Sequence, residues 1–482
     1  MRHPMHFSPC SRTWRRRLGC AAVALLAAAA PARAQTLPDV LATTYQTNPQ
    51  IEADRARQRS LDDDVARAIG GWRPNVSVTA EAGRGTDTQQ TTAAGPPFYI
   101  PPYQFSEMRT PETLLLQIQQ YIYDGGRVTA DIRHSEMVVE SGLAQMVSVE
   151  QTVLGQAIQA YYDLYRDQQI VQLSKENVAW LQDVVKATHA RYLVKDVTQT
   201  DVAQAEARLA GGLADLTTAE GNVQTSISAF IAATGVTPGT LAAPPAPPRP
   251  LLPRSREDAQ HAAETSPDMI MAKFTARAAD ADVDYAASGL MPTLSLRGTS
   301  RHLSETDQQY YNRTDNEVVL SLNIPLYEGG VYAARTRGAK QVAGQRRLEI
   351  DETRRKAIDQ VNRAWTALMA ARANITSISE QVRAAEVARH SIRAEVRVGT
   401  RTLYDELLAE QDMMNAKIGL LRAQHDEAVA SYSVLGAIGE LTAKALDVPT
   451  QLYDPSVHYE KVRDKWWGTG IDESYDKPPQ TN

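Results

Sequence analysis

The 482-residue sequence predicts a mainly α-helical fold with a few membrane β-strands, organised as two internal repeats. The stretch Ile122–Ala130 recurs at Leu326–Ala334, 204 residues later, and such recurrence indicates a duplicated unit. Two proline-free stretches, 112–237 and 326–448, are rich in Ala, Gln, Glu, Arg and Leu, which favours long helices. Segments in which apolar and polar residues alternate lie before both stretches and indicate β-strands.

The first 34 residues predict a secretory signal peptide. Four arginines at positions 12–17 precede an apolar run over residues 18–30, and cleavage is expected after Ala34. The run has 13 residues, whereas a helix needs roughly 20 to span a bilayer. Cys10 and Cys20 both lie in this segment, so the exported chain is expected to contain no thiol and no disulfide.

The charge of the exported chain argues against nucleic acid as a partner. Removal of residues 1–34 takes away six of the 51 basic residues and none of the 57 acidic ones, so the net charge becomes 45 − 57 = −12. The sequence also contains no phosphate-binding loop, no nucleophile motif and no metal-ligand spacing. It therefore predicts no enzyme activity, no cofactor and no bound metal.

Repeated motifs set the predicted domain boundaries. Asn48-Pro49 recurs as Ser266-Pro267 at an offset of 218, which is 14 more than the later offset of 204. The difference falls between Pro74 and Tyr123 and predicts a surface loop of variable length. We expect a signal peptide (1–34), a first repeat (35–235), a proline-rich linker (236–255), a second repeat (256–441) and a tail (442–482). The tail is either docked around Trp466 and Trp467 or loose.

Two strands are expected in each half. Val318, Leu320 and Leu322 fall on one face of the last strand, and polar residues alternate with them. Each strand has roughly 8 to 12 residues, close to the 9 to 11 that a tilted strand needs to cross a bilayer. The intervening loops, Thr86–Thr110 and Ser300–Asn316, are expected to face the cell exterior.

Long helices are expected after the strands. Apolar residues in both halves step by three and four, as in coiled coils; they are Leu154, Ile158, Tyr161, Tyr165 and Ile358, Val361, Trp365, Leu368. As a single helix, Arg127–Tyr192 would be about 100 Å long.

The glycine pairs Gly125-Gly126 and Gly329-Gly330 are expected where a strand turns into a helix. Glycine reaches positive φ at little cost, and such a sharp change of direction requires it. The neighbouring Tyr123 and Tyr327 would then lie at the membrane interface, where aromatic residues are enriched. Four strands cannot close a membrane barrel, because the smallest known ones have eight. The barrel must therefore be shared, and three chains would give 12 strands.

This ordered set of features resembles the TolC-type outer-membrane factor family over residues 37–441. The resemblance implies a homotrimer whose 12-stranded outer-membrane β-barrel continues into a long periplasmic α-helical coiled-coil barrel. It implies a passive channel-tunnel for efflux of small molecules or type I secretion of proteins, with a periplasmic adaptor protein and an inner-membrane pump, ABC or proton-driven, as partners. The alternative interpretation is an exported structural or adhesive coiled-coil protein of the cell envelope.

The resemblance also implies candidate site residues. The family carries a VG-x-x-T-x-x-D turn at the periplasmic entrance, and this chain has Val398 and Gly399 in one copy and Val194 and Lys195 in the other. These four residues are the implied adaptor contacts.

The same resemblance implies a gate in which Arg401 pairs with Thr200 and Asp201 between the two helix pairs. It implies an acidic ring of Asp405, which Glu406 or Glu410 would supplement. Two positions depart from the family pattern, because its tyrosine is Val396 here and its second ring aspartate is Leu408.

Overall fold

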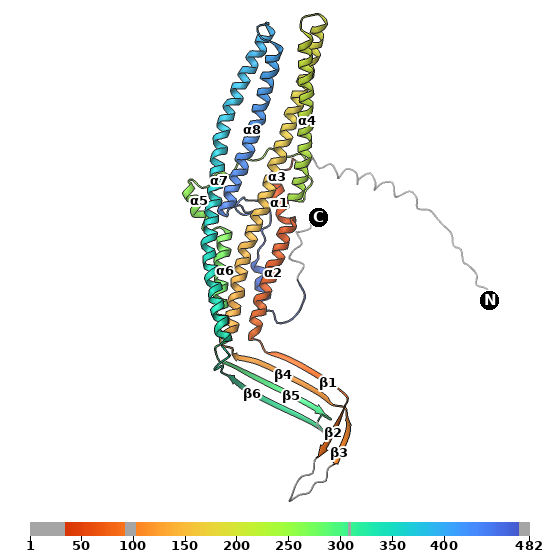
Figure 1. Cartoon of the computed structure of the whole chain (residues 1–482), viewed down its shortest axis with the longest axis vertical. Coiled ribbons are helices and arrows are strands. Elements are labelled where there is room, and N and C mark those ends of the chain that lie inside the picture. Colours follow the sequence, from red (N-terminus) through yellow and green to blue (C-terminus); the bar gives the residue numbers. More distant parts are fainter. Residues whose placement is uncertain (1–33, 92–102, 307–309, 472–482) are drawn as a thin grey trace, which may run out of the picture.

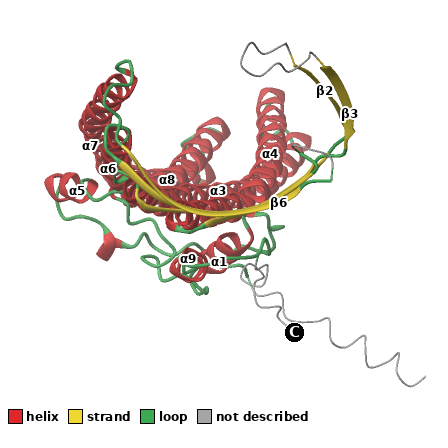
Figure 2. Cartoon of the chain, turned by 90° about the horizontal axis from the view of Figure 1, so that it is seen from below, coloured by secondary structure: helices red, strands yellow, loops and turns green. Residues whose placement is uncertain are grey.

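The computed structural model describes residues 34–91, 103–306 and 310–471, so nearly all of the predicted signal peptide lies outside it. The molecule is elongated, with long helices at one end and a β-sheet at the other (Figure 1). Seen along the long axis, helices and sheet form a curved layer with α1 and α9 on its convex side (Figure 2).

The described elements follow one another in a similar order in both halves of the chain. The first half contains α1 (Leu37–Thr47), α2 (Pro49–Ile69), the 3-10 turn η1 (Gly70–Trp72), β1 (Asn75–Ala82), β2 (Gly85–Thr91), β3 (Tyr103–Arg109), β4 (Glu112–Tyr123), α3 (Arg127–Leu193) and α4 (Gln199–Thr234). After the 3-10 turn η2 (Arg249–Leu251) come α5 (Arg256–Ala263), α6 (Pro267–Ser288), β5 (Thr293–Ser304), β6 (Asn312–Asn323), α7 (Val331–Arg397), α8 (Leu403–Ile438) and α9 (Ser456–Arg463).

The four predicted strands form one antiparallel sheet in the order β1-β4-β5-β6. Its apolar side chains are exposed in the single chain, as Val318 at 76% illustrates.

The two loops expected between the paired strands were predicted too long. The segment Thr86–Thr110 contains the paired strands β2 and β3, and β5 and β6 extend into Ser300–Asn316. Arg109 of β3 forms an ion pair with Asp87 of β2, which links the two strands of this hairpin.

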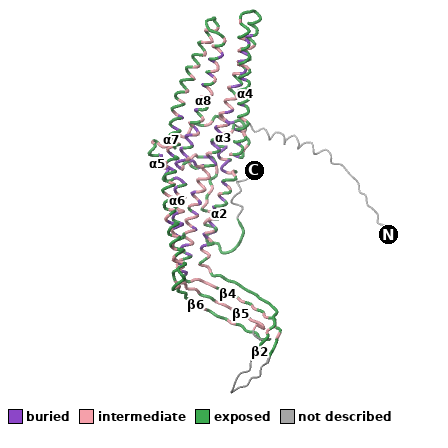
Figure 3. Tube along the Cα trace, viewed as in Figure 1, coloured by how far each residue is buried: buried purple, intermediate pink, exposed green. Residues whose placement is uncertain are grey.

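The long helices confirm the prediction of a single helix over Arg127–Tyr192, because α3 has 67 residues and α7 has the same number. Much of the predicted apolar seam is buried, including Leu154, Tyr161 and Leu368. Buried residues lie mainly in the helical part, whereas the sheet and the far ends of the long helices are exposed (Figure 3). The exposed surfaces are therefore the β-sheet and the two helical turns.

Candidate functional site: the helical turns and the strand-to-helix junctions

The helices α3 and α7 end in the same backbone motif. The N–H groups of Lys195 and Asp196 donate to carbonyls three and five residues earlier, and Gly399 and Thr400 repeat both hydrogen bonds in α7. The φ angles are 62° at Lys195 and 77° at Gly399. This is the Schellman ending, whose left-handed position favours glycine. Lys195 therefore carries a side chain in a conformation that suits glycine better.

The helices α4 and α8 begin with equivalent capping boxes. In the first turn, the Thr198 hydroxyl accepts from the Asp201 N–H at 3.2 Å and the Asp201 carboxylate accepts from the Thr198 N–H at 2.8 Å. Thr402 and Asp405 make the same pair of hydrogen bonds at 3.3 and 3.0 Å. Both bonds satisfy N–H groups that a helix start leaves free. The T-x-x-D part of the family motif thus has a local structural role in this chain.

The capping box also fixes the charge of Asp405. Hydrogen bonds from the Thr402 backbone N–H and hydroxyl, together with the charge of Arg401, hold the pKa of Asp405 below its usual value. The carboxylate is therefore ionised at neutral pH. It can contribute to an acidic ring while it caps α8.

Arg401 interacts with its own turn. Its guanidinium lies 3.2 Å from the Glu395 carboxylate and 3.9 Å from that of Asp405. Among the described residues of one chain, it does not contact Thr200 or Asp201, because those residues lie on the other helical turn, which is a separate tip of the molecule (Figure 1). The expected gate contact is thus not made within a chain.

The acids expected to supplement Asp405 are already paired. Glu406 lies 3.0 Å from Arg393 of α7, and Glu410 lies 3.3 Å from Arg389 of the same helix. These ion pairs join α8 to α7, so within one chain both acids already have a cationic partner. Leu408 is 41% exposed between them.

The turns expose apolar side chains. Leu193, Val194 and Val398 lie at the two ends and are 81%, 75% and 74% exposed. Water disfavours such exposed apolar side chains, so each turn is suited to contact another protein. Val396, two residues before Val398, is half-buried.

The glycine pairs lie between a strand and a long helix. Gly125 and Gly126 follow β4 and have φ angles of 74° and 86°, and Gly329 and Gly330 precede α7 with 62° and 77°. A Cβ at Gly125 would lie 2.8 Å from the Met291 Cβ, whereas one at Gly330 would meet nothing within 4 Å. Gly125 is therefore required by both backbone conformation and packing.

The acid of the YDGG motif caps the helix that follows. The Asp124 carboxylate accepts from the Gly126 N–H at 3.0 Å and the Val128 N–H at 2.6 Å, and it is buried. The sequence pattern had indicated the turn, but not this cap.

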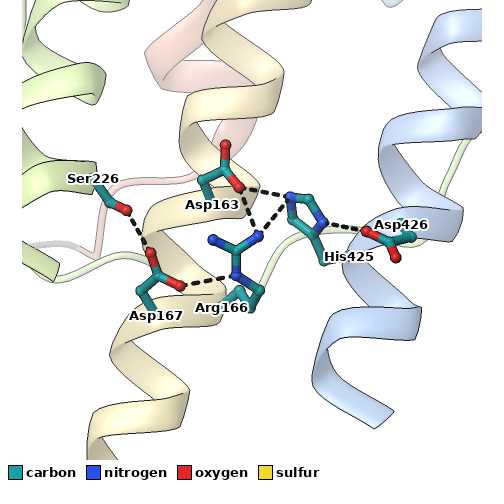
Figure 4. A network of polar contacts seen from close by, with 6 residues as sticks. All are labelled: Asp163, Arg166, Asp167, Ser226, His425 and Asp426. Atoms are coloured by element: carbon teal, nitrogen blue, oxygen red, sulfur yellow. Dashed lines mark hydrogen bonds and ion pairs between the residues drawn. The ribbon is translucent and has the colours of Figure 1, made fainter. Parts of the chain in front are cut away.

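A polar network joins the two halves of the chain between α3, α4 and α8 (Figure 4). His425 of α8 lies 2.9 Å from Asp163 and 3.0 Å from Asp426. Arg166 lies 2.8 Å from Asp163, and it also contacts Asp167, which accepts a hydrogen bond from the Ser226 hydroxyl of α4. The sequence analysis missed this network because its members lie far apart in the sequence.

The ion pairs of this network depend on the protonation states of His425 and Asp163. Burial favours neutral His425, but hydrogen bonds to Asp163 and Asp426 outweigh burial and raise the pKa of His425 above its usual value. Burial likewise opposes ionisation of Asp163, yet His425 and Arg166 lower the pKa of Asp163. The contact between α3 and α8 is therefore an ion pair at pH values below about 6.5, where His425 is protonated.

Comparisons with known proteins agree with this architecture. The family model described as "Outer membrane efflux protein" matches residues 40–236 and 259–440. The chain is 32% identical to outer membrane efflux protein BepC of Brucella suis over 441 residues, 91% of this chain and 92% of that protein. It is 23% identical to outer membrane protein TolC of Vibrio cholerae, over 85% and 92% of the two chains.

Solved structures show the same fold. The Campylobacter jejuni CmeC outer membrane channel superposes with a TM-score of 0.71 at 15% identity, over 89% of each chain. None of the described helices is long and apolar enough to cross a membrane.

Proposed function

The chain belongs to the outer membrane efflux protein family, as the resemblance predicted, and we propose that it is the passive exit duct of a tripartite export complex. It is an outer-membrane protein that extends into the periplasm. The observation that carries the proposal is a sheet with exposed apolar side chains that continues directly into two 67-residue helices. Each helix is about 100 Å long, enough to reach far from the membrane. The equal lengths of α3 and α7 support the proposal of two structural repeats.

We propose a homotrimer with a 12-stranded barrel. In the described part of the chain, β1 and β6 each pair with one strand, so each sheet edge keeps unpaired backbone groups. Lipid offers these backbone groups no hydrogen-bond partner. Pairing of the edge strands of neighbouring chains is therefore favoured. Light scattering of the detergent-extracted protein should give the mass of three chains; a stable monomer would contradict the barrel.

The helical turns are the proposed docking surface for the periplasmic adaptor, which links the duct to an inner-membrane pump. The exposed Val194, Lys195, Val398 and Gly399 support this assignment. We propose that Arg401 closes the entrance by contacting Thr200 and Asp201 of a neighbouring chain.

Efflux of small molecules is the leading substrate class, because BepC, the relative at 32% identity, is named an efflux protein. A gene-deletion strain should become sensitive to small toxic compounds and recover with the full chain. Unchanged sensitivity together with loss of a secreted protein from the medium would instead indicate protein secretion.

Channel activity separates the duct from an adhesive coiled-coil protein. The purified protein should conduct ions in planar lipid bilayers. Extraction without detergent and absence of conductance would favour the adhesive protein.

A further inference from the structure

The chain continues past α9 as a segment with unusually exposed apolar residues, Lys465–Ile471. Trp466, Trp467 and Ile471 are 60%, 85% and 81% exposed. Tryptophan prefers a setting where its ring leaves water and its N–H stays near polar groups. The interface between a membrane and water offers both.

The helix before this segment is fixed to the body of the protein. His458 of α9 lies 3.0 Å from the buried Asp62 of α2, and Arg463 lies 3.5 Å from Glu136 of α3. Val462 is buried beside them. The tail is therefore docked through α9, and the position of the following residues is set by the fold.

Arg73 holds the exposed segment next to the sheet. Its guanidinium donates to the Lys465 carbonyl oxygen at 2.6 Å and lies 4.7 Å from the centre of the Trp466 ring. Arg73 is two residues before Asn75, the first residue of β1. The Lys465 ammonium donates to the Gly470 carbonyl at 3.2 Å, which folds the segment back on itself.

Other aromatic residues lie at the same end of the sheet. Tyr123 is the last residue of β4 and Tyr327 follows β6, and they are 47% and 85% exposed. Aromatic residues gather at this depth of membrane proteins. α9 lies on the convex side of the curved layer, away from the concave face (Figure 2). The segment therefore lies beside the strand ends on that side, where lipid would surround the barrel.

We propose that Lys465–Ile471 is a membrane-surface anchor, which places Trp467 and Ile471 in the outer-membrane leaflet that faces the periplasm. The partner is the lipid surface itself. Arg73 lies beside the Trp466 ring and Lys465 directly precedes it in the chain, and both cations suit the phosphate groups of lipids. The inference rests on the proposed function, because the sheet must be in the membrane for the segment to reach it.

Spin labels test this placement, because the exported chain is expected to contain no cysteine. Single variants Trp467→Cys and Ile471→Cys are labelled with a nitroxide in the full chain and reconstituted into phospholipid vesicles. Collisions with oxygen, which concentrates in lipid, are compared with collisions with a water-soluble nickel complex. We expect both labels to gain oxygen collisions and lose nickel collisions relative to a label at Leu193→Cys on the helical turn.

A label at Leu320→Cys, on the apolar side of β6, separates the two possible failures. If Leu320 reports lipid but Trp467 and Ile471 report water as Leu193 does, the anchor is refuted and the channel stands. If the labels at Trp467 and Ile471 collide with neither oxygen nor the nickel complex, protein covers these positions and the anchor is also refuted. If Leu320 itself reports water, the membrane placement of the sheet fails and the anchor fails with it.

Discussion

Lys195 adopts a left-handed backbone conformation that its counterpart Gly399 adopts without a Cβ. The conformation costs a residue with a side chain roughly 1 kcal/mol. We expect Lys195→Gly to stabilise the turn between α3 and α4 by about that amount. Hydrogen exchange of the amides at the end of α3 should slow.

Gly399→Lys is the matched control and should speed exchange at the end of α7. Faster exchange in Lys195→Gly would show that contacts of the lysine side chain outweigh the backbone strain.

Asp405 combines a structural and an electrostatic role that one substitution can separate. Asp405→Asn keeps a side-chain oxygen for the Thr402 N–H but removes the negative charge. We expect a lower preference for cations in planar bilayers, because three charges leave the axis of the proposed trimer. Exchange protection at the start of α8 should persist, and an unchanged reversal potential would exclude the acidic ring.

The entrance residues show what sequence can predict about a site. The T-x-x-D spacing is itself a capping-box pattern, so the caps formed by Asp201 and Asp405 were readable in the sequence. The ion pairs of Glu406 and Glu410 were not, because they depend on which residues of α7 face α8. The neighbours of Arg401 in another chain depend on assembly, which the sequence of one chain does not describe.

At the scale of elements, the two strand-to-helix junctions differ in how strongly they require glycine. Gly125→Ala would bring a Cβ to 2.8 Å from the Ser288 carbonyl oxygen, in addition to the strain of positive φ. Gly330→Ala adds only the strain, roughly 1 kcal/mol. We expect Gly125→Ala to lower the thermal stability of the assembled protein more; equal melting temperatures would contradict the packing argument.

The contact between α3 and α8 should depend on pH. The raised pKa of His425 means that its contribution is complete below the unfolded value of about 6.5 and is lost as pH rises through the folded pKa. The lowered pKa of Asp163 means that its contribution is present above about 3.8 and is lost as pH falls further. Stability of this contact should therefore be greatest between these two limits.

We expect hydrogen exchange around residue 425 to accelerate when pH rises above the folded pKa of His425, after correction for intrinsic exchange rates. His425→Gln should abolish this pH dependence. His189→Gln, which removes the partly exposed pair with Glu206 in the other hairpin, should leave it intact. A pH profile unaffected by His425→Gln would rule out control by this residue.

Simple sequence patterns predicted the long helices and the strands of the four-stranded sheet, but they did not predict β2 and β3. Absence of proline and three-four apolar spacing predicted α3 and its end within one residue of Leu193. The alternation in β6 predicted a strand. The strand β2 was missed because polar residues occupy both of its faces, and β3 was missed because its apolar Phe105 and Met108 fall on opposite faces, so no alternation marks either strand.

At the scale of the whole molecule, one chain is an incomplete duct. In the described part of the chain, β1 and β6 are the two edges of the four-stranded sheet, and the two helical turns are separate tips at the far end (Figure 1). In the proposed trimer, neighbouring chains would close both ends. Arg401 can take part, because its side chain is half-exposed although it pairs with Glu395 at 3.2 Å and lies 3.9 Å from Asp405.

Arg401→Ser should raise single-channel conductance in planar bilayers while the trimer remains intact. An exposed arginine pair contributes only about 0 to 1 kcal/mol, so its loss shifts the balance between closed and open entrances without unfolding the helices. Arg383→Ser is the control, because Arg383 pairs with Glu380 within α7 away from the turn. Equal conductance in both variants would show that Arg401 serves its own turn, where Glu395 already holds it at 3.2 Å.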